Sequence, residues 1–255
     1  MQPGDTKTIS SVERSFRILG ALVERDGAGV NELATELGYA PSTVHAHLAT
    51  LHRLGYVRTI DGEYDISNRF LYFSQYARAR VTGLDVIETN VERLAEETDE
   101  RVQFMIEEHG RGIYVTTAKG RHGTPNNTTL GNPRYLHICA SGKAILAHLP
   151  SERVSDIVAR WGLPAQTERT ITDEETLHAE LEAIRERGYS TNEGETVEGL
   201  TAIGAPVRSA DERVIGAISI SGPTHRLSTD GEIKALYRET LRGAIEDITL
   251  NLTFT

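Results

Sequence analysis

The sequence predicts an α+β protein with an N-terminal winged helix-turn-helix, a linker helix, and a larger C-terminal unit in which helices pack on an antiparallel sheet. Three helical patterns and a short hairpin pattern occupy residues 1–68. Beyond residue 84, segments of alternating hydrophobicity lie between amphipathic helices, which is typical of an antiparallel sheet. A length of 255 residues suits one large domain or two ordinary ones. We therefore predict domains at 1–68 and 84–255, joined by a linker at 69–83.

Composition excludes several classes of protein. The chain is 38% hydrophobic and 25% charged, so it can bury a core and is not disordered. It has no apolar run long enough to span a membrane, and its N-terminus lacks the apolar region of a secretory signal. Its single cysteine, Cys139, excludes a disulfide framework and a multi-cysteine metal site. We expect a cytoplasmic protein without cofactor, metal or membrane partner.

The charge is acidic and poor in lysine. Asp and Glu number 37 against 27 Lys and Arg, a formal charge of −10, and only four of the basic residues are lysine. This balance is typical of a protein from a high-salt host, although a GC-rich genome also favours arginine. Because DNA affinity comes largely from neutralising phosphates, an acidic chain can bind nucleic acid only through a local region that lacks acidic residues.

The first 68 residues contain the pattern of a winged helix-turn-helix. A first helix is expected over 11–25, where Val12, Phe16, Leu19, Leu22 and Val23 recur at helical spacing. Asn31 is expected to cap a second helix over 32–37. Pro41 suits the first turn of a third helix, which Gly55 ends. Strands at 56–60 and 63–66 flank Asp61-Gly62, a dipeptide that favours a type I′ hairpin turn.

The third helix is the candidate DNA-reading element. No acidic residue lies between Leu37 and Ile60, and the helix positions opposite Val44, Leu48 and Leu51 are small or polar. Such side chains can approach base edges in the major groove. The expected DNA contacts are Arg14, Ser42, Thr43, His45, His47, Thr50, Arg53 and Arg58. Two alternatives remain open: a solvated helix that binds nothing, and a module that binds another protein.

The rest of the chain predicts alternating helices and strands. Helices are expected over 70–79, 84–97 and 141–149, from a Thr172–Glu175 capping box to Gly188, and over 230–251. Strands are expected over 101–108, 112–118, 201–208 and 214–221, and a loop over 120–132.

Several segments together resemble one family. SVERSFRILGAL and VNELATELGYAPSTVHAHLATLHRLGYV are similar to the DNA-binding domain of IclR-type transcriptional regulators. ASGKAILAHLP, RERGYSTNEGETVEGLTAIGAPV and VIGAISISGP resemble that family's effector-binding domain. The resemblance implies a GAF-like C-terminal fold, an operator of double-stranded DNA, a small-molecule effector, and homodimers or homotetramers. Many members carry arginine where Ala46 stands, so the operator consensus does not carry over.

A ligand pocket is expected where the 141–149 helix begins. Free backbone N–H groups there favour a carboxylate or phosphate. Ser219 and Ser221 share one face of a strand, while Ile218 and Ile220 share the other. The resemblance places the effector at these elements and, position by position, implies Ala140, Ser141, Asn192, Leu200, Ala202, Ser219 and Ser221. Asn192 and Ala202 stand where some members have an acidic residue and a cysteine. Small organic or sugar acids are therefore compatible, and aromatic acids stay open as an alternative.

An enzyme is the remaining alternative. It would act on a small acid through Cys139 or Ser141, with His137 on the same face of an expected strand as Cys139. No third, orienting group is apparent, so a buried structural cysteine is the simpler interpretation. Gly142-Lys143 lacks the upstream glycine of a phosphate-binding loop, and Lys143 is expected on the helix surface or beside an anion. We predict no catalytic residue and no metal ligand.

Overall fold

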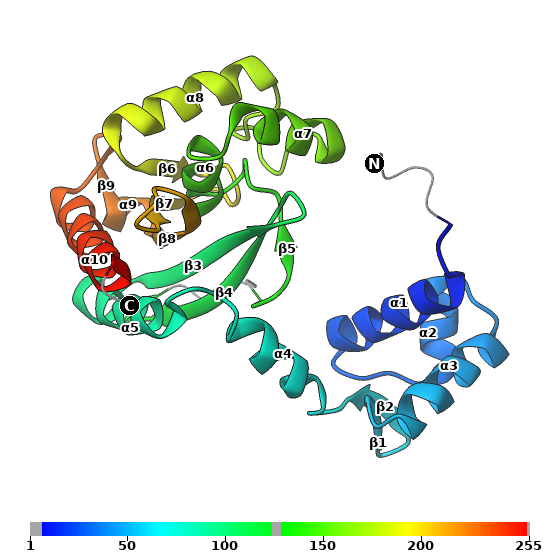
Figure 1. The fold of residues 1–255 in the computed structure, drawn as a ribbon. Coiled ribbons are helices and arrows are strands. Elements are labelled where there is room, and N and C mark those ends of the chain that lie inside the picture. Colours follow the sequence, from blue (N-terminus) through cyan, green and yellow to red (C-terminus); the bar gives the residue numbers. More distant parts are fainter. Residues whose placement is uncertain (1–6, 124–128, 254–255) are drawn as a thin grey trace. The chain divides into compact units, whose positions relative to one another are not determined.

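The computed structural model describes residues 7–123 and 129–253, which divide into two compact units at residues 1–80 and 81–255 (Figure 1). Pro125, Asn126 and Asn127 of the expected loop lie outside the described residues. Among the helices that are described, none is both long and apolar enough to cross a membrane.

The first unit is a winged helix-turn-helix followed by a further helix. Its elements are α1 (Ser10–Arg25), α2 (Val30–Leu37), α3 (Pro41–Arg53), β1 (Val57–Ile60), β2 (Glu63–Ile66) and α4 (Phe70–Arg78). The two strands pair antiparallel, and their connecting residues Asp61 and Gly62 both have positive φ, as a type I′ turn requires. This fold is the one that the sequence predicts.

The core of the first unit lies between α1, α2 and α3. Ile18 and Leu22 of α1 are fully buried there against Val44 and Leu48 of α3. The expected apolar stripe of α1 was wrong in part, because Val12, Phe16 and Val23 are exposed. These three residues and Ile9, which is also exposed, form a second apolar face on α1.

Two helix ends in this unit are set by local hydrogen bonds. The N–H of Gly29 donates to Glu32 Oε2 at 2.9 Å at the start of α2, so Gly29 and not Asn31 occupies the cap position. At the end of α3, Gly55 adopts φ +79°, and the N–H groups of Gly55 and Tyr56 donate to the carbonyls of His52 and Leu51. This is the Schellman arrangement that glycine favours, and it turns the chain from α3 into the wing.

The second unit is a six-stranded antiparallel sheet in the order β5-β4-β3-β8-β7-β6. Its strands are β3 (Arg101–Glu108), β4 (Arg111–Lys119), β5 (Pro133–Arg134), β6 (Ser190–Glu193), β7 (Leu200–Arg208) and β8 (Val214–Pro223), and a separate pair is β9 (Ser228–Thr229) with β10 (Glu232–Ile233). Its helices are α5 (Leu84–Thr98), α6 (Ala140–Ala147), α7 (Ser151–Trp161), α8 (Glu174–Arg187), α9 (Thr224–Leu227) and α10 (Ala235–Thr253).

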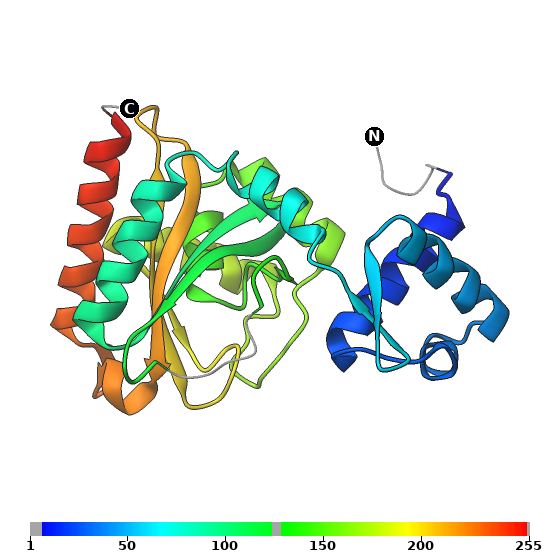
Figure 2. The ribbon, with the colours of Figure 1, turned by 90° about the horizontal axis from the view of Figure 1, so that it is seen from below.

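Each face of the large sheet is covered by helices. Helices α5 and α10 lie side by side on one face, where Phe104, Ile218 and Ile220 are buried (Figures 1 and 2). Helices α6, α7 and α8 contribute to a second core that includes Met105 and Ala217 of the opposite face. The alternation along β8 therefore divides its side chains between two environments, as predicted.

Several expected boundaries in this unit were wrong. Asp173, not Thr172, caps α8, because its carboxylate accepts the N–H of Thr176. The last helix begins at Ala235, since Asp230 and Gly231 form the turn between β9 and β10. Helix α7 and strand β6 were not expected.

Candidate functional site

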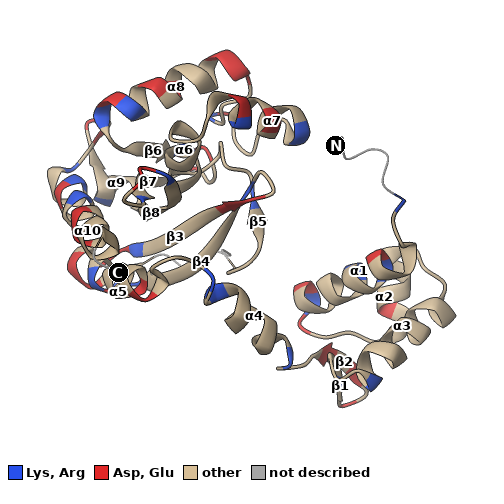
Figure 3. Cartoon of the chain, viewed as in Figure 1, with Lys and Arg blue, Asp and Glu red and all other residues tan. Residues whose placement is uncertain are grey.

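The outward face of α3 combines exposed polar and small residues. Ser42, His45, Thr50 and Arg53 are exposed, and Thr43 is half-buried at the first turn. Pro41 occupies the first helical position and lacks an N–H, so no donor is lost there. As Figure 3 shows, α3 carries no acidic side chain, whereas Asp and Glu are frequent on α8 and α10.

Three of the expected DNA contacts already have partners within the first unit. His47 is half-buried and its Nδ1 lies 2.8 Å from Ser15 Oγ of α1. The hydroxyl of Thr50 donates to the carbonyl of Ala46 at 2.8 Å. Arg58 on the wing pairs with Asp65 at 2.7 Å, which lowers the pKa of that carboxyl below its usual value. Of the eight residues, these three would have to rearrange or share their partners to contact DNA.

The two other arginines are exposed as well. Arg53 is exposed in the last turn of α3, and Arg14 on α1 is exposed with its guanidinium 5.8 Å from the ring centre of Tyr39. Arg14, Arg53 and Arg58 are thus all on the surface of the first unit, where they can meet a negatively charged ligand.

A cavity of about 610 Å³ lies between the sheet and the beginning of α6. It is lined by Gln103, Tyr114, Arg134, Ile138, Cys139, Ala140, Gln166, Asn192, Thr196, Val197, Glu198, Leu200, Thr201, Ala202, Ser219 and Ser221. Six of the seven expected effector residues are among them. The seventh, Ser141, is fully buried, and its Oγ lies 3.5 Å from Tyr114 Oη and 3.6 Å from Met105 Sδ.

The sheet residues that form the cavity floor belong to two cross-strand rows. In the first row Gln103, Ser219 and Gly204 are cross-strand neighbours. In the second row Arg101, Ser221, Ala202 and Asn192 are neighbours in that order across four strands. Because the rows are two residues apart on each strand, both face the same side of the sheet.

Gly204 allows the start of α6 to approach this floor. A Cβ atom on Gly204 would lie 2.8 Å from the carbonyl carbon of Ala140 and 2.9 Å from Ser190 Oγ. The Ser190 hydroxyl donates to the carbonyl of Ala140 at 2.6 Å and fixes the contact. The positive end of the α6 dipole is therefore held beside Ser219, where it favours a negatively charged group.

Basic side chains add to this positive potential. The side chain of Arg134, from β5, lines the cavity. Arg101 is buried at the end of the second floor row, and the loss of water around its guanidinium lowers its pKa. Glu198 is the only acidic residue among the lining residues that the structure describes, and it is exposed. The cavity suits an anion with an apolar body.

The segment after β6 is tethered above the cavity by hydrogen bonds. The side-chain amide of Asn192 donates to the carbonyl of Ile138 and to Thr196 Oγ1 at 3.0 Å, and its oxygen accepts the N–H of Gly194. Thr196 also donates to Ile138. Asn192 thus lines the cavity, as expected, and its polar atoms hold the segment after β6 in place.

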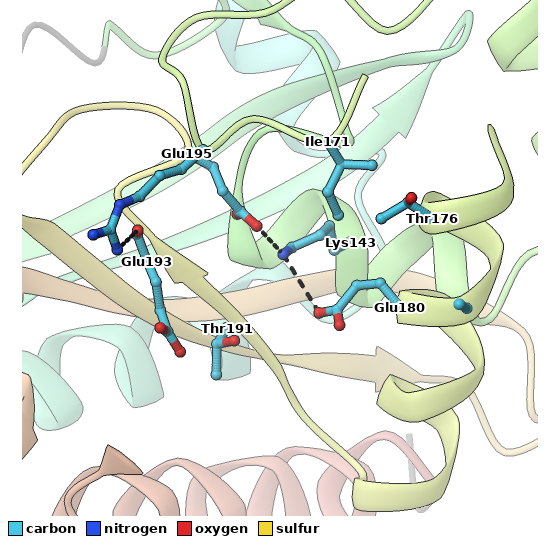
Figure 4. A pocket seen from close by; sticks show the side chains of 9 residues that line it. Lys143, Ile171, Thr176, Glu180, Thr191, Glu193 and Glu195 are labelled. Atoms are coloured by element: carbon cyan, nitrogen blue, oxygen red, sulfur yellow. Dashed lines mark hydrogen bonds and ion pairs between the residues drawn. The ribbon is translucent and has the colours of Figure 1, made fainter. Parts of the chain in front are cut away.

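Lys143 strengthens the same tether, and its expected surface position was wrong. Its side chain is buried, with Nζ 2.6 Å from Glu195 Oε1 and 3.4 Å from Glu180 Oε1 (Figure 4). This ion pair connects α6 to the segment that follows β6 and to α8. Burial raises the pKa of Glu195, although the ammonium of Lys143 acts in the opposite direction.

The enzymatic alternative required His137 and Cys139 to share one face of a strand, and the structure does not place them so. Residues 137–138 form a turn and no strand, and His137 Nε2 lies 3.2 Å from the carbonyl of Pro164. The Cys139 sulfur lies among Met105, Ser141 and Tyr114, and burial raises the pKa of its thiol. A half-buried thiol with a raised pKa and no base beside it is a poor nucleophile. Within the described residues no group of three His, Cys, Asp or Glu side chains is placed to hold a metal ion.

Gln103, Tyr114, Arg134 and Thr196 are lining residues that were not expected. Each belongs to a strand or loop whose place beside α6 depends on pairing between distant segments. The alternation of β3 alone indicated that Gln103 and Met105 share a face, but not which face meets the cavity.

Both units match known families. The family model for the IclR helix-turn-helix domain matches residues 11–61, and the one for the bacterial transcriptional regulator IclR C-terminal domain matches residues 80–250. A probable HTH-type transcriptional regulator ArcR of Halobacterium salinarum is 32% identical, over 92% of this chain and 92% of its own. The transcriptional repressor IclR of Escherichia coli is 29% identical, over 88% and 84% of the two chains.

Solved structures have the same fold. The Thermotoga maritima IclR has a TM-score of 0.78 at 26% identity and covers 96% of this chain and 99% of its own. An IclR homolog from Microbacterium hydrocarbonoxydans, complexed with 4-hydroxybenzoate, has a TM-score of 0.80 at 23% identity and covers 95% and 98%. From the two family matches and the relatives that span most of its length, the chain belongs to the IclR family of ligand-responsive, DNA-binding transcriptional regulators.

Proposed function

We propose that this regulator senses a small organic or sugar acid in the cavity between α6 and the sheet. The observation that carries the proposal is the start of α6, held over Gly204 beside Ser219 in a cavity that Arg134 also lines. These groups supply N–H donors, hydroxyls and positive charge for a carboxylate, while Ile138, Leu200 and Ala202 supply apolar walls. The homolog complexed with 4-hydroxybenzoate makes a hydroxylated aromatic acid a reasonable first probe.

The first unit is proposed to bind the operator. Helix α3 would enter the major groove, with Ser42, Thr43, His45, His47 and Thr50 near base edges. Arg14, Arg53 and Arg58 would contact phosphates. The exposure of Ser42, His45 and Arg53 and the absence of acidic residues on α3 support this orientation.

A homodimer is the proposed minimal assembly, and pairing of dimers would give a tetramer. One short helix reads too few base pairs to identify a genomic site. The second apolar face of α1, with Phe16 67% exposed and Val23 61% exposed, supports an interface between copies of the chain. Residues 1–68 would then bind DNA, 69–83 would transmit the change, and 84–255 would bind effector and contribute to assembly.

We propose no enzymatic activity and a cytoplasmic location beside chromosomal DNA. The raised pKa of Cys139 and the burial of Ser141 argue against the alternative in which either residue is a nucleophile. A Cys139→Ala variant should retain the response to effector.

The test is binding of the purified chain to its own upstream DNA, measured by fluorescence anisotropy across a series of NaCl concentrations. We expect site-specific binding that weakens steeply with salt and that one acid of a panel shifts. By linkage, DNA must change the affinity for that acid by the same factor. DNA binding without a steep salt dependence would favour a protein-binding role for the winged helix, and independent DNA and acid affinities would contradict the coupling.

A further inference from the structure

We propose that Gln103 selects acids that carry a second oxygen atom, to which its side-chain amide donates a hydrogen bond. This inference rests on the proposed function, since it concerns the chemistry of the acid in the same cavity. It adds a hydrogen-bond donor that would bind the end of the ligand opposite the carboxylate.

Gln103 is a buried polar residue with an unused donor. Only 2% of its surface is exposed, yet it lines the cavity, and its Nε2 has no hydrogen-bond partner among the described residues. A buried amide without a partner is destabilising, and such groups are uncommon in native proteins. A ligand oxygen would satisfy it.

The position of Gln103 relates it to the anion-binding end of the cavity. Ser219 lies between Gln103 on β3 and Gly204 on β7 in one cross-strand row. The start of α6 contacts that row at Gly204. Neighbouring Cβ atoms in such a row are about 5 Å apart. An acid whose carboxylate meets the α6 N–H groups and Ser219 therefore extends its other end toward Gln103.

Three other polar side chains of the sheet are already engaged in hydrogen bonds. Tyr114 Oη accepts from Ser141, and the amide of Asn192 is used by Ile138 and Thr196. Thr117, the neighbour of Gln103 on β4, donates to the carbonyl of Val102 at 3.4 Å. Gln103 is thus the amide of the floor that remains available to a ligand.

Two pairs of acids that differ by one hydroxyl group test the inference by isothermal titration calorimetry. They are benzoate with 4-hydroxybenzoate, and hexanoate with 6-hydroxyhexanoate. In the unmodified protein the hydroxylated member of at least one pair should bind about tenfold more tightly, the equivalent of one good hydrogen bond of about 1.4 kcal/mol. In Gln103→Leu that preference should disappear, while the plain acid keeps its affinity within about twofold.

Gln75→Leu is the control, because Gln75 on α4 is exposed and is not among the residues that line the cavity. It should leave the preference unchanged. Equal affinities for both members of each pair, or a preference that survives Gln103→Leu, would overturn the inference and leave the acid-sensing function standing. Failure of every acid to bind the unmodified protein would overturn both.

A measurement without ligand distinguishes a ligand-binding role of the Gln103 amide from a structural one. If the Gln103 amide is unpaired in the free protein, Gln103→Leu removes a buried unsatisfied donor and should raise Tm by about 2–4 °C. A lower Tm would show that the amide has a structural partner, and would overturn the proposal.

Discussion

At the residue scale, the ion pair of Lys143 should matter most for stability. Lys143→Met removes the cation that compensates the buried carboxylate of Glu195, whose Oε2 already has no hydrogen-bond partner among the described residues. Breaking such a pair from one side costs about 3–5 kcal/mol. We expect that loss in the free energy of unfolding, measured by urea denaturation. The exposed Lys119→Met should change it by less than about 0.5 kcal/mol, and equal effects of the two variants would contradict the structural role.

Asp65 on the wing should limit DNA affinity. It pairs with Arg58, and Asp65→Asn frees that guanidinium for a phosphate. We expect tighter DNA binding and a salt dependence of log K steeper by about 1. Asp61→Asn is the matched control, since it makes the same change of charge at the wing turn without freeing Arg58. If both variants steepen the salt dependence equally, the Arg58–Asp65 pair does not limit binding.

The sequence predicted the position of a side chain correctly where that position depends only on the helix or strand to which the residue belongs. The opposite faces of Ser219 and Ile218 follow from strand alternation alone. The surface position expected for Lys143 was wrong because its partner Glu195 is 52 residues away, on a segment that only the fold brings near. Gln103 was missed for the same physical reason.

At the element scale, the approach of α6 to the sheet depends on Gly204. In Gly204→Ala the new Cβ would lie within 3.0 Å of Ala140 backbone atoms and must displace α6 or β7. We expect a loss of about 1–3 kcal/mol in stability and weaker acid binding, measured by urea denaturation and calorimetry. Gly243→Ala in α10 meets open space and should stabilise by about 0.5–1 kcal/mol. Unchanged acid affinity in Gly204→Ala would mean that α6 does not hold the carboxylate.

The existence of most elements was predictable, whereas their ends were not. Strong periodicity identified α3, α5 and the β7–β8 hairpin. The start of α2 depends on Gly29, whose N–H donates to Glu32, and that of α8 on Asp173, where Asn31 and Thr172 had been expected. The start of α10 depends on the turn between β9 and β10. Strand β6 has the polar sequence STNE and becomes a strand only by pairing with β7.

At the scale of the whole molecule, salt should act on folding and on DNA binding in opposite directions. The charge of −10 produces self-repulsion in the folded chain that ions screen. Raising the NaCl concentration should therefore raise Tm in thermal unfolding. The affinity for DNA should fall, because salt cations compete with the protein's basic side chains for the phosphates. A Tm that falls with added salt would show that paired charges outweigh net repulsion. The expected rise of Tm with salt follows from the composition alone.

The cross-strand register of the cavity floor also constrains how ligand preference can diverge among related chains. Ser221 and Ala202 line the cavity only because the side chains that alternate with them face the hydrophobic core. Inserting or deleting one residue in β7 or β8 would exchange the two sets and place isoleucines toward the ligand and serines in the core. New effector preferences are therefore accessible to this fold through point substitutions in these strands, whereas length variation is tolerated in the loops that surround them.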